Sequence, residues 1–184
     1  MSDFIVAYRK YDYPKREVYY RLCDNFSKFW LTFCYNNLTT NTSFWHDNQQ
    51  LPQVRAWCGF SFETVCFNHI AQIKQALGIE GVQTEVCPWQ SRTEKDGAQI
   101  DMIIDRADNV MNICKMKYSE DDYAITASYD KTLRHKLTAL REETGCRKNL
   151  RLTLVTTYGL RANEYAGRIQ KVITMDDLFA PTRR

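Results

Sequence analysis

Two apolar runs joined by a short polar turn constrain the fold of this chain most. Residues 99–106 and 110–118 are rich in Ile, Val and Met, and Ala107-Asp108-Asn109 stands between them. Short apolar runs bounded by turn-forming residues are typical of β-strands, and a connection of three residues predicts an antiparallel hairpin. Any fold of this chain is therefore expected to include a β-hairpin at residues 99–118.

Helical periodicity is clear in three other segments. Apolar residues recur at helical spacing in residues 18–37, 61–77 and 129–144. Gly78 and Gly145 directly follow the second and third segments, where glycine is well suited to end a helix. We expect three amphipathic helices.

Three further segments have the pattern of strands. These are residues 82–89, 150–157 and 168–173. Thr174 and Asp177 then resemble a capping box for a last helical turn. The order of elements predicts an α/β fold with a mixed β-sheet flanked by helices. The polar stretch 39–48 is the best linker candidate, so we expect a short N-terminal helical segment at residues 1–48 and the main domain at residues 49–184.

Cysteine usage and apolar content bear on where the protein is located. The seven cysteines are scattered without a C-x-x-C pair, so we expect reduced, mostly buried thiols rather than disulfides or a zinc site. No apolar run approaches the roughly 18 residues of a membrane span. Residues 1–6 lack the basic and apolar regions of a signal peptide. These features predict a cytoplasmic protein.

Charge is distributed unevenly along the chain. Residues 131–184 hold 12 Lys and Arg against 5 Asp and Glu, whereas residues 1–130 hold 13 against 17. A basic segment suits contact with phosphates, and Arg134, Lys136 and Arg141 on the predicted helix are the best candidates for nucleic-acid contacts. A solvated helix face explains these three residues equally well.

Charged side chains on the predicted hairpin form the candidate site. Because strand side chains alternate between faces, Asp101, Ile103 and Asp105 are expected to share one side of their strand, and Lys115 and Lys117 one side of theirs. The hairpin would bring Asp101 near both lysines, with Glu63 arriving from the helix at residues 61–77. This arrangement fits a phosphodiesterase site or a structural ion pair at the sheet edge, and spacing alone slightly favours the ion pair.

Several motifs occur together in an order that resembles one protein family. They are Gly59-Phe60-Ser61-Phe62-Glu63, Trp89, Gly97-Ala98-Gln99-Ile100-Asp101, Asn112-Ile113-Cys114-Lys115-Met116-Lys117-Tyr118-Ser119, Thr156-Thr157-Tyr158-Gly159-Leu160 and Asp176-Asp177-Leu178-Phe179. The string resembles the C-terminal domain of a family of prokaryotic AAA-type ATPases. That domain of unknown function is described as a restriction-endonuclease-like, PD-(D/E)XK fold, and the resemblance covers residues 4–179.

The resemblance implies roles for individual residues. Glu63 and Asp101 would bind magnesium, and Lys117 would orient the nucleophile. The family pattern reads Cys-Glu-Met-Lys where this chain has Lys115 in place of the glutamate. An ammonium group offers no lone pair to magnesium and repels it, at a cost on the order of 8 kcal/mol for a separation of about 4 Å and an effective dielectric of about 20. Glu85 on the neighbouring strand is the alternative carboxylate.

Three functions remain open on this basis. The first is a nuclease-derived module that binds nucleic acid or an ATPase partner, with catalysis impaired by Lys115. The sequence contains no G-x-x-x-x-G-K-[ST] phosphate loop, so the ATPase module is absent from it. Either this is a detached domain, or the rest of the ATPase lies on another polypeptide or was removed. The second is an active magnesium-dependent DNA endonuclease that uses Glu63, Asp101 and Lys117. The third is a purely structural interaction domain.

Overall fold

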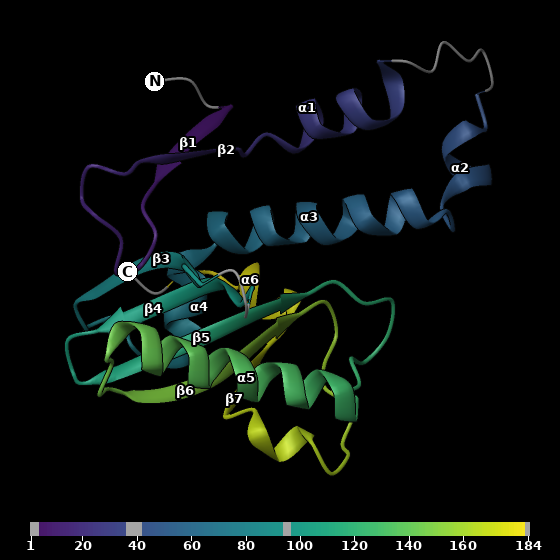
Figure 1. Cartoon of the computed structure of the whole chain (residues 1–184). Helices are drawn as coiled ribbons and strands as arrows, with labels where there is room; N and C mark the ends of the chain where they lie inside the picture. The colour runs from purple at the N-terminus through teal and green to yellow at the C-terminus, as the bar shows by residue number, and fades with distance from the viewer. Residues whose placement is uncertain (1–3, 36–41, 94–96, 183–184) are drawn as a thin grey trace.

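The computed structural model describes residues 4–35, 42–93 and 97–182, which form two β-sheets with helices around them (Figure 1). The smaller sheet pairs β1 (Ile5–Tyr8) with β2 (Tyr19–Leu22) antiparallel. The larger sheet contains, in spatial order, β3 (Thr84–Gln90), β4 (Gln99–Arg106), β5 (Val110–Lys117), β6 (Asn149–Thr156) and β7 (Lys171–Ile173). Strands β3 to β5 pair antiparallel and β5 to β7 pair parallel, so the sheet is mixed.

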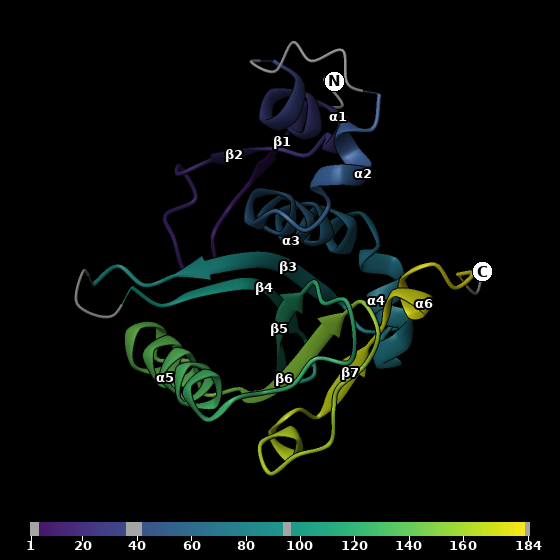
Figure 2. The ribbon, with the colours of Figure 1, turned by 90° about the vertical axis from the view of Figure 1, so that its right-hand side faces the viewer.

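Helices flank both faces of the larger sheet. They are α1 (Asn25–Phe29), which continues as the π-helix η1 (Trp30–Cys34), α2 (Phe44–Asn48), α3 (Pro52–Asn68), α4 (Ile70–Leu77), α5 (Ala127–Thr144), the 3₁₀-helix η2 (Ala166–Arg168) and α6 (Met175–Leu178). Figure 2 shows α5 on one side of the sheet and α4 and α6 on the other. The predicted α/β class, a mixed sheet flanked by helices, is confirmed.

The two faces of the sheet have separate buried clusters. One cluster packs the sheet against α3, α4 and α6 and includes Phe62, Met102 and Met116. The other packs the sheet against α5 and includes Ile113 and Leu140. Because β4 and β5 are covered on both faces, they carry apolar residues toward both clusters, such as Met102 and Ile103 on β4, and these apolar runs make the hairpin prominent in the sequence.

The N-terminal segment differs from the predicted helix at residues 18–37. Tyr19–Leu22 is a strand paired with β1, and the helix begins only at Asn25. Two adjacent tyrosines, Tyr19 and Tyr20, favour a strand at this point, and the Asp24 carboxylate accepts a hydrogen bond from the Ser27 N–H (2.6 Å), which caps the new helix. The first 48 residues are therefore not purely helical. Of the predicted linker at residues 39–48, residues 39–41 lie outside the described residues, and its end is α2.

The helix predicted at residues 61–77 is two helices. Helix α3 begins earlier, at Pro52, because proline suits the first helical position. It ends at His69, whose backbone leaves the helical region (φ −115°, ψ 32°), and α4 follows. Gly78 ends α4 in the left-handed conformation (φ 65°), as predicted.

The remaining predicted elements are found close to their expected places. Residues 99–118 form the predicted antiparallel hairpin, with Asn109 in the left-handed conformation at its turn (φ 64°). Gly145 ends α5 (φ 64°), and Asp177 accepts a hydrogen bond from the Thr174 backbone N–H (2.8 Å) in the capping box.

An aromatic cluster connects the N-terminal segment to α3. Phe29, Phe33, Trp45 and Trp57 pack together mostly edge to face, with ring centroids 5.2 to 6.1 Å apart. This cluster spans the predicted division at residue 48, which stays a prediction. In Figures 1 and 2, β1, β2 and α1 lie on the side of α3 that faces away from the larger sheet.

Two structural features relate to the predicted cytoplasmic location, namely the state of the cysteines and the apolarity of the helices. All seven cysteines are free, as predicted, but only Cys66, Cys87 and Cys114 are buried; the other four are partly exposed. Within residues 4–35, 42–93 and 97–182, no helix has the length and apolarity to cross a bilayer.

Candidate functional site

Asp101 and Lys115 form an ion pair at one end of the hairpin. The register of β4 and β5 pairs Met102 with Cys114, so Asp101 and Lys115 come next along the two strands. Lys115 Nζ donates a hydrogen bond to Asp101 Oδ2 at 2.5 Å, and the Met116 N–H approaches the same oxygen at 3.4 Å. The side chains of Asp101 and Lys115 are only 9% and 15% exposed, so this carboxylate is almost enclosed by the chain itself.

A shift in strand pairing lies beside Asp101. The pairing of β3 with β4 shifts by one residue at Pro88, and Ile100 and Ile103 consequently both pack against α5 although they are three residues apart. The alternation of side chains between the two faces of β4 is therefore interrupted at Asp101. The prediction that Asp101 and Asp105 share one face relied on that alternation, which does not hold here. Proline has no N–H to donate and occurs in sheets at bulges, so Pro88 is the sequence feature that could have indicated the irregularity.

Glu63 reaches the same site from α3. Its side chain is half-buried, and burial together with the Asp101 carboxylate raises its pKa, while Lys115, Lys117 and Lys28 act in the opposite direction. The sequence-predicted residues Glu63, Asp101, Lys115 and Lys117 are therefore brought into one electrostatic neighbourhood.

Lys117 and Lys136 extend this neighbourhood toward α5. Lys117 Nζ lies 5.0 Å from the centroid of the Tyr129 ring. Burial and the nearby Lys115 ammonium both lower the pKa of Lys117, and the same two causes lower the pKa of Lys136. Of the three cations predicted on this helix, Lys136 is the one that belongs to the site.

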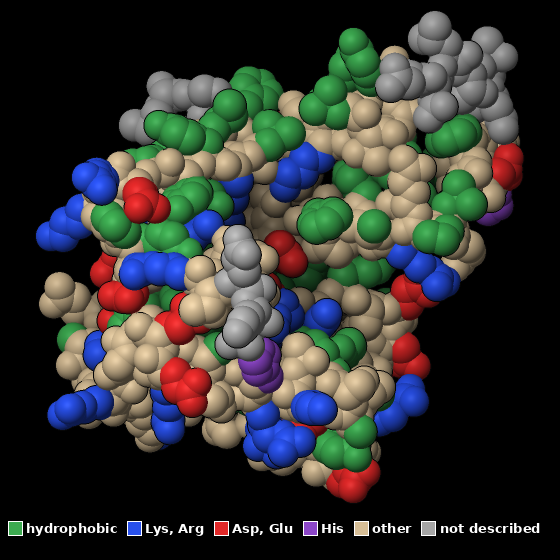
Figure 3. All heavy atoms as spheres, in the orientation of Figure 1, with side chains coloured by type: hydrophobic (Ala, Val, Ile, Leu, Met, Phe, Trp, Pro, Cys, Tyr) green, Lys and Arg blue, Asp and Glu red, His purple; other side chains and the backbone are tan. Residues whose placement is uncertain are grey.

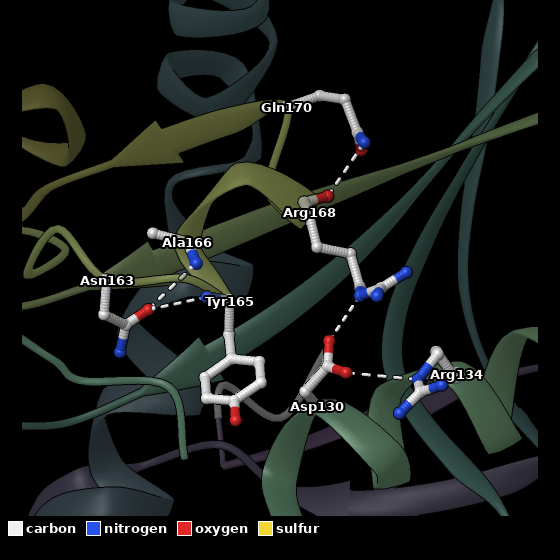
Figure 4. A network of polar contacts seen from close by, with 7 residues as sticks. All are labelled: Asp130, Arg134, Asn163, Tyr165, Ala166, Arg168 and Gln170. Carbon is white, nitrogen blue, oxygen red and sulfur yellow. Dashed lines mark hydrogen bonds and ion pairs between the residues drawn. The ribbon is translucent and has the colours of Figure 1, made fainter. Parts of the chain in front are cut away.

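Arg134 and Arg141, the other two cations predicted on α5, lie in different environments from Lys136. Figure 4 shows Arg134 and Arg168 on the buried Asp130 carboxylate, which joins the start of α5 to the segment before β7. Arg134 Nε lies 3.1 Å from Asp130 Oδ2. Arg141 is an exposed residue in the last turn of α5.

The carboxylates do not fit a divalent metal ion. Asp101 is paired with Lys115, so its oxygen already has a cationic partner. Glu85 pairs with Asp105 across the sheet, four residues or about 13 Å along the strand from Asp101, and does not substitute for the missing glutamate. In the part of the chain that the structure describes, no group of three or more His, Cys, Asp or Glu side chains is arranged to hold a metal ion.

Two cations that sequence reasoning did not include come from the N-terminal segment. Arg21 on β2 and Lys28 on α1 line a pocket of about 550 Å³ that Glu63 also lines. Figure 3 shows a hollow beneath this segment, with basic and acidic side chains in its walls. The packing of residues 4–35 over α3 creates this proximity, which local sequence patterns do not indicate.

The site has a net positive charge. Among the residues that the structure describes, its cations are Arg21, Lys28, Lys115, Lys117 and Lys136, and its carboxylates are Glu63 and Asp101. Half-buried ammonium groups that outnumber their carboxylate partners are costly unless an anion joins them. The arrangement can therefore attract and hold an anionic group.

The fold and the site together define an α/β domain with an enclosed cationic site at one end of its central hairpin. No family model matches this chain, and no match was found among curated proteins or solved structures. The resemblance to the ATPase C-terminal domain stays a prediction.

Proposed function

We propose that this protein is a restriction-endonuclease-like module that binds nucleic acid at the site of Glu63, Asp101 and Lys117 and has lost metal-dependent cleavage. The observation that carries this proposal is the Lys115–Asp101 ion pair, at 2.5 Å. Lys115 occupies the position that, by the resemblance, belongs to a metal-binding glutamate, and its ammonium group neutralises the remaining central carboxylate. A site of this kind attracts phosphate instead of magnesium.

The charge balance supports nucleic acid as the ligand. Five cations surround two carboxylates at this site, and three of the cations are lysines on β5 and α5. Phosphate groups provide most of the affinity in sequence-independent nucleic-acid binding, through contacts with Lys and Arg. The alternative of an active magnesium-dependent endonuclease has less support, because among the described residues no third carboxylate, Glu85 included, joins Asp101 and Glu63 in a metal-binding group.

A partner protein is a second candidate ligand, favoured by an exposed apolar surface. Phe26, Leu31 and Tyr35 on and after α1 are 73%, 54% and 60% exposed, and exposed apolar patches often mark protein interfaces. We propose that a AAA-type ATPase module absent from this sequence is such a partner, and that the protein functions in the cytoplasm, where its free cysteines would stay reduced.

Metal binding is the first test of the proposal. We expect calorimetric titration with magnesium or manganese to show no binding at millimolar concentrations for the natural protein, and measurable binding for Lys115→Glu, because the variant restores a second carboxylate beside Asp101. Lys171→Glu, which makes the same charge change at an exposed position on β7, is the control and should not bind. Metal binding by the natural protein would contradict the loss of the metal site.

Nucleic-acid binding is tested by its salt dependence. We expect fluorescence anisotropy with labelled oligonucleotides to show an affinity that falls steeply with salt. Lys117→Gln and Lys136→Gln should each reduce the slope of log K against log salt by about 1, as loss of one phosphate contact does. Lys171→Gln is the matched control. An affinity that does not depend on salt, or that both variants leave unchanged, would exclude this site as the nucleic-acid interface.

A further inference from the structure

The pocket beside Glu63 has walls of two kinds. It lies between the β2–α1 segment and α3 and has a volume of about 550 Å³, which is in the size range of sites for small ligands. Arg21 and Lys28 contribute charge to its lining, and Trp57 and Phe60 contribute aromatic surface. A ligand that fills it would have an anionic part and a planar apolar part.

Arg21 is a half-buried cation that forms no ion pair among the described residues. Its guanidinium lies 3.7 Å from the centroid of the Phe67 ring, and its Nε atom is buried without a hydrogen-bond partner. No ion pair joins it to a carboxylate in the described parts of the chain. Burial lowers the pKa of Arg21, which is the sign of a cation that has lost water without gaining an equivalent partner.

Lys28 is in the same situation. Its Nζ atom donates a hydrogen bond to Thr64 Oγ1 at 2.5 Å, a neutral partner. Burial is the main cause that lowers its pKa, and the neighbouring Arg21 is the next. The two positive charges repel each other within one pocket, so an anion placed between them is expected to stabilise both.

The charges of the surrounding residues indicate how much negative charge the pocket can take. Lys115 is paired with Asp101. Glu63 lines the pocket too, and Lys115, Lys117 and Lys28 all offset its charge. Over these six groups the four cations exceed the two carboxylates by two, which corresponds to the charge of +2 of the Arg21 and Lys28 pair. A terminal phosphate, which has a charge of nearly −2 at neutral pH, matches this pair better than a backbone phosphodiester with a charge of −1.

The aromatic wall suggests what accompanies the phosphate. Phe60 is 65% exposed although it lines the pocket, so its ring is free to receive a ligand surface. Nucleobases stack on exposed aromatic side chains in this way.

From these observations we infer that the pocket binds a nucleotide with a terminal phosphate, which lies between Arg21 and Lys28 with its base against Phe60. Such a nucleotide is either free or the end of a nucleic-acid strand. The second form rests on the proposed function, whereas the first does not.

The free nucleotide is tested by calorimetry with AMP, adenosine and inorganic phosphate as probes. We expect AMP to bind more tightly than either fragment. Arg21→Gln and Lys28→Gln should each weaken AMP binding at least tenfold, and circular dichroism would confirm that both variants are folded. Arg16→Gln, at an exposed position between β1 and β2, is the matched control and should bind AMP like the natural protein. If neither pocket variant differs from this control, Arg21 and Lys28 do not hold the phosphate.

The strand end is tested with single-stranded oligonucleotides that have a 5′-phosphate, a 3′-phosphate or no terminal phosphate. Tighter binding of a phosphorylated strand, lost in Arg21→Gln, supports a strand end as the ligand. AMP binding that depends on Arg21, without binding of any oligonucleotide, supports a free nucleotide and contradicts the proposed function. Salt-dependent oligonucleotide binding that needs neither a terminal phosphate nor Arg21, with no AMP binding, overturns the inference and leaves the proposed function standing.

Discussion

At residue 115, a single side chain decides what the Asp101 carboxylate can bind. The lysine ammonium lies 2.5 Å from this carboxylate, in a place where both side chains are largely removed from water. A buried carboxylate needs a cationic partner or hydrogen-bond donors, and the chain supplies that partner itself.

Glu63 provides a prediction about pH. Its pKa in the folded protein is raised above the ordinary value of 4.5, so its ionised form is less stable in the folded protein than in the unfolded chain. This cost is fully present above the raised pKa and disappears as the pH falls below about 4.5. We therefore expect Glu63→Gln to stabilise the protein at pH 7, and the gain to vanish near pH 4.

Urea unfolding at several pH values would measure this difference. Glu142→Gln, an exposed substitution on α5, controls for the change of side-chain chemistry. A Glu63→Gln variant that is less stable than the natural protein at pH 7 would show that the lysines around Glu63 outweigh its burial.

At the scale of elements, local sequence patterns correctly predicted the features that depend on local interactions, such as turns and helix ends. The hairpin at residues 99–118 and the ends of α4 and α5 at Gly78 and Gly145 follow from turn chemistry and periodicity, and all are confirmed. The strand at Tyr19–Leu22 was missed because its partner, β1, comes from a separate segment. The break at His69 leaves the apolar pattern of residues 61–77 unchanged, so periodicity could not reveal it.

The Asp130 network gives a prediction at this scale. Asp130 is 2% exposed and holds Arg134 and Arg168, so it fixes the start of α5 against the segment before β7 (Figure 4). We expect Asp130→Ala to lower the free energy of unfolding by about 1–3 kcal/mol, because both arginines lose a charged partner.

The control for this substitution is another aspartate. Asp121 pairs with Arg161 at 3.4 Å, but the two side chains are 82% and 60% exposed. Asp121→Ala should therefore cost less than about 1 kcal/mol. Equal effects in urea unfolding would mean that Asp130 does not anchor α5.

At the scale of the whole molecule, the aromatic cluster predicts how the protein unfolds. Phe33 is 5% exposed and packs edge to face against Trp57 of α3, and the same helix carries Phe62 into the core under the sheet. We expect Phe33→Ala to cost about 3–5 kcal/mol, and the chain to unfold in one transition.

Coincident transitions by tryptophan fluorescence and circular dichroism would confirm this behaviour. Leu31→Ala, which removes an exposed side chain from the same turn, is the control. Two separate transitions would show that the predicted division at residue 48 separates two independent units.

In the candidate site too, some residue contacts follow from local sequence and others depend on tertiary packing. The pairing of Asp101 with Lys115 was foreseeable, because two strands joined by a short turn have a register that their sequence largely determines. The contributions of Arg21 and Lys28 depend on how a segment some 40 residues earlier packs over α3, and no spacing rule covers that contact.

The Lys115–Asp101 pair has a consequence for the conditions under which the protein would act. A nuclease that depends on magnesium loses its central cation when a chelator is added or when the free ion becomes scarce. An ammonium group that is part of the chain cannot be removed in this way. Under the proposed function, the protein would still bind nucleic acid in the presence of EDTA, and its affinity would not change with the concentration of divalent ions.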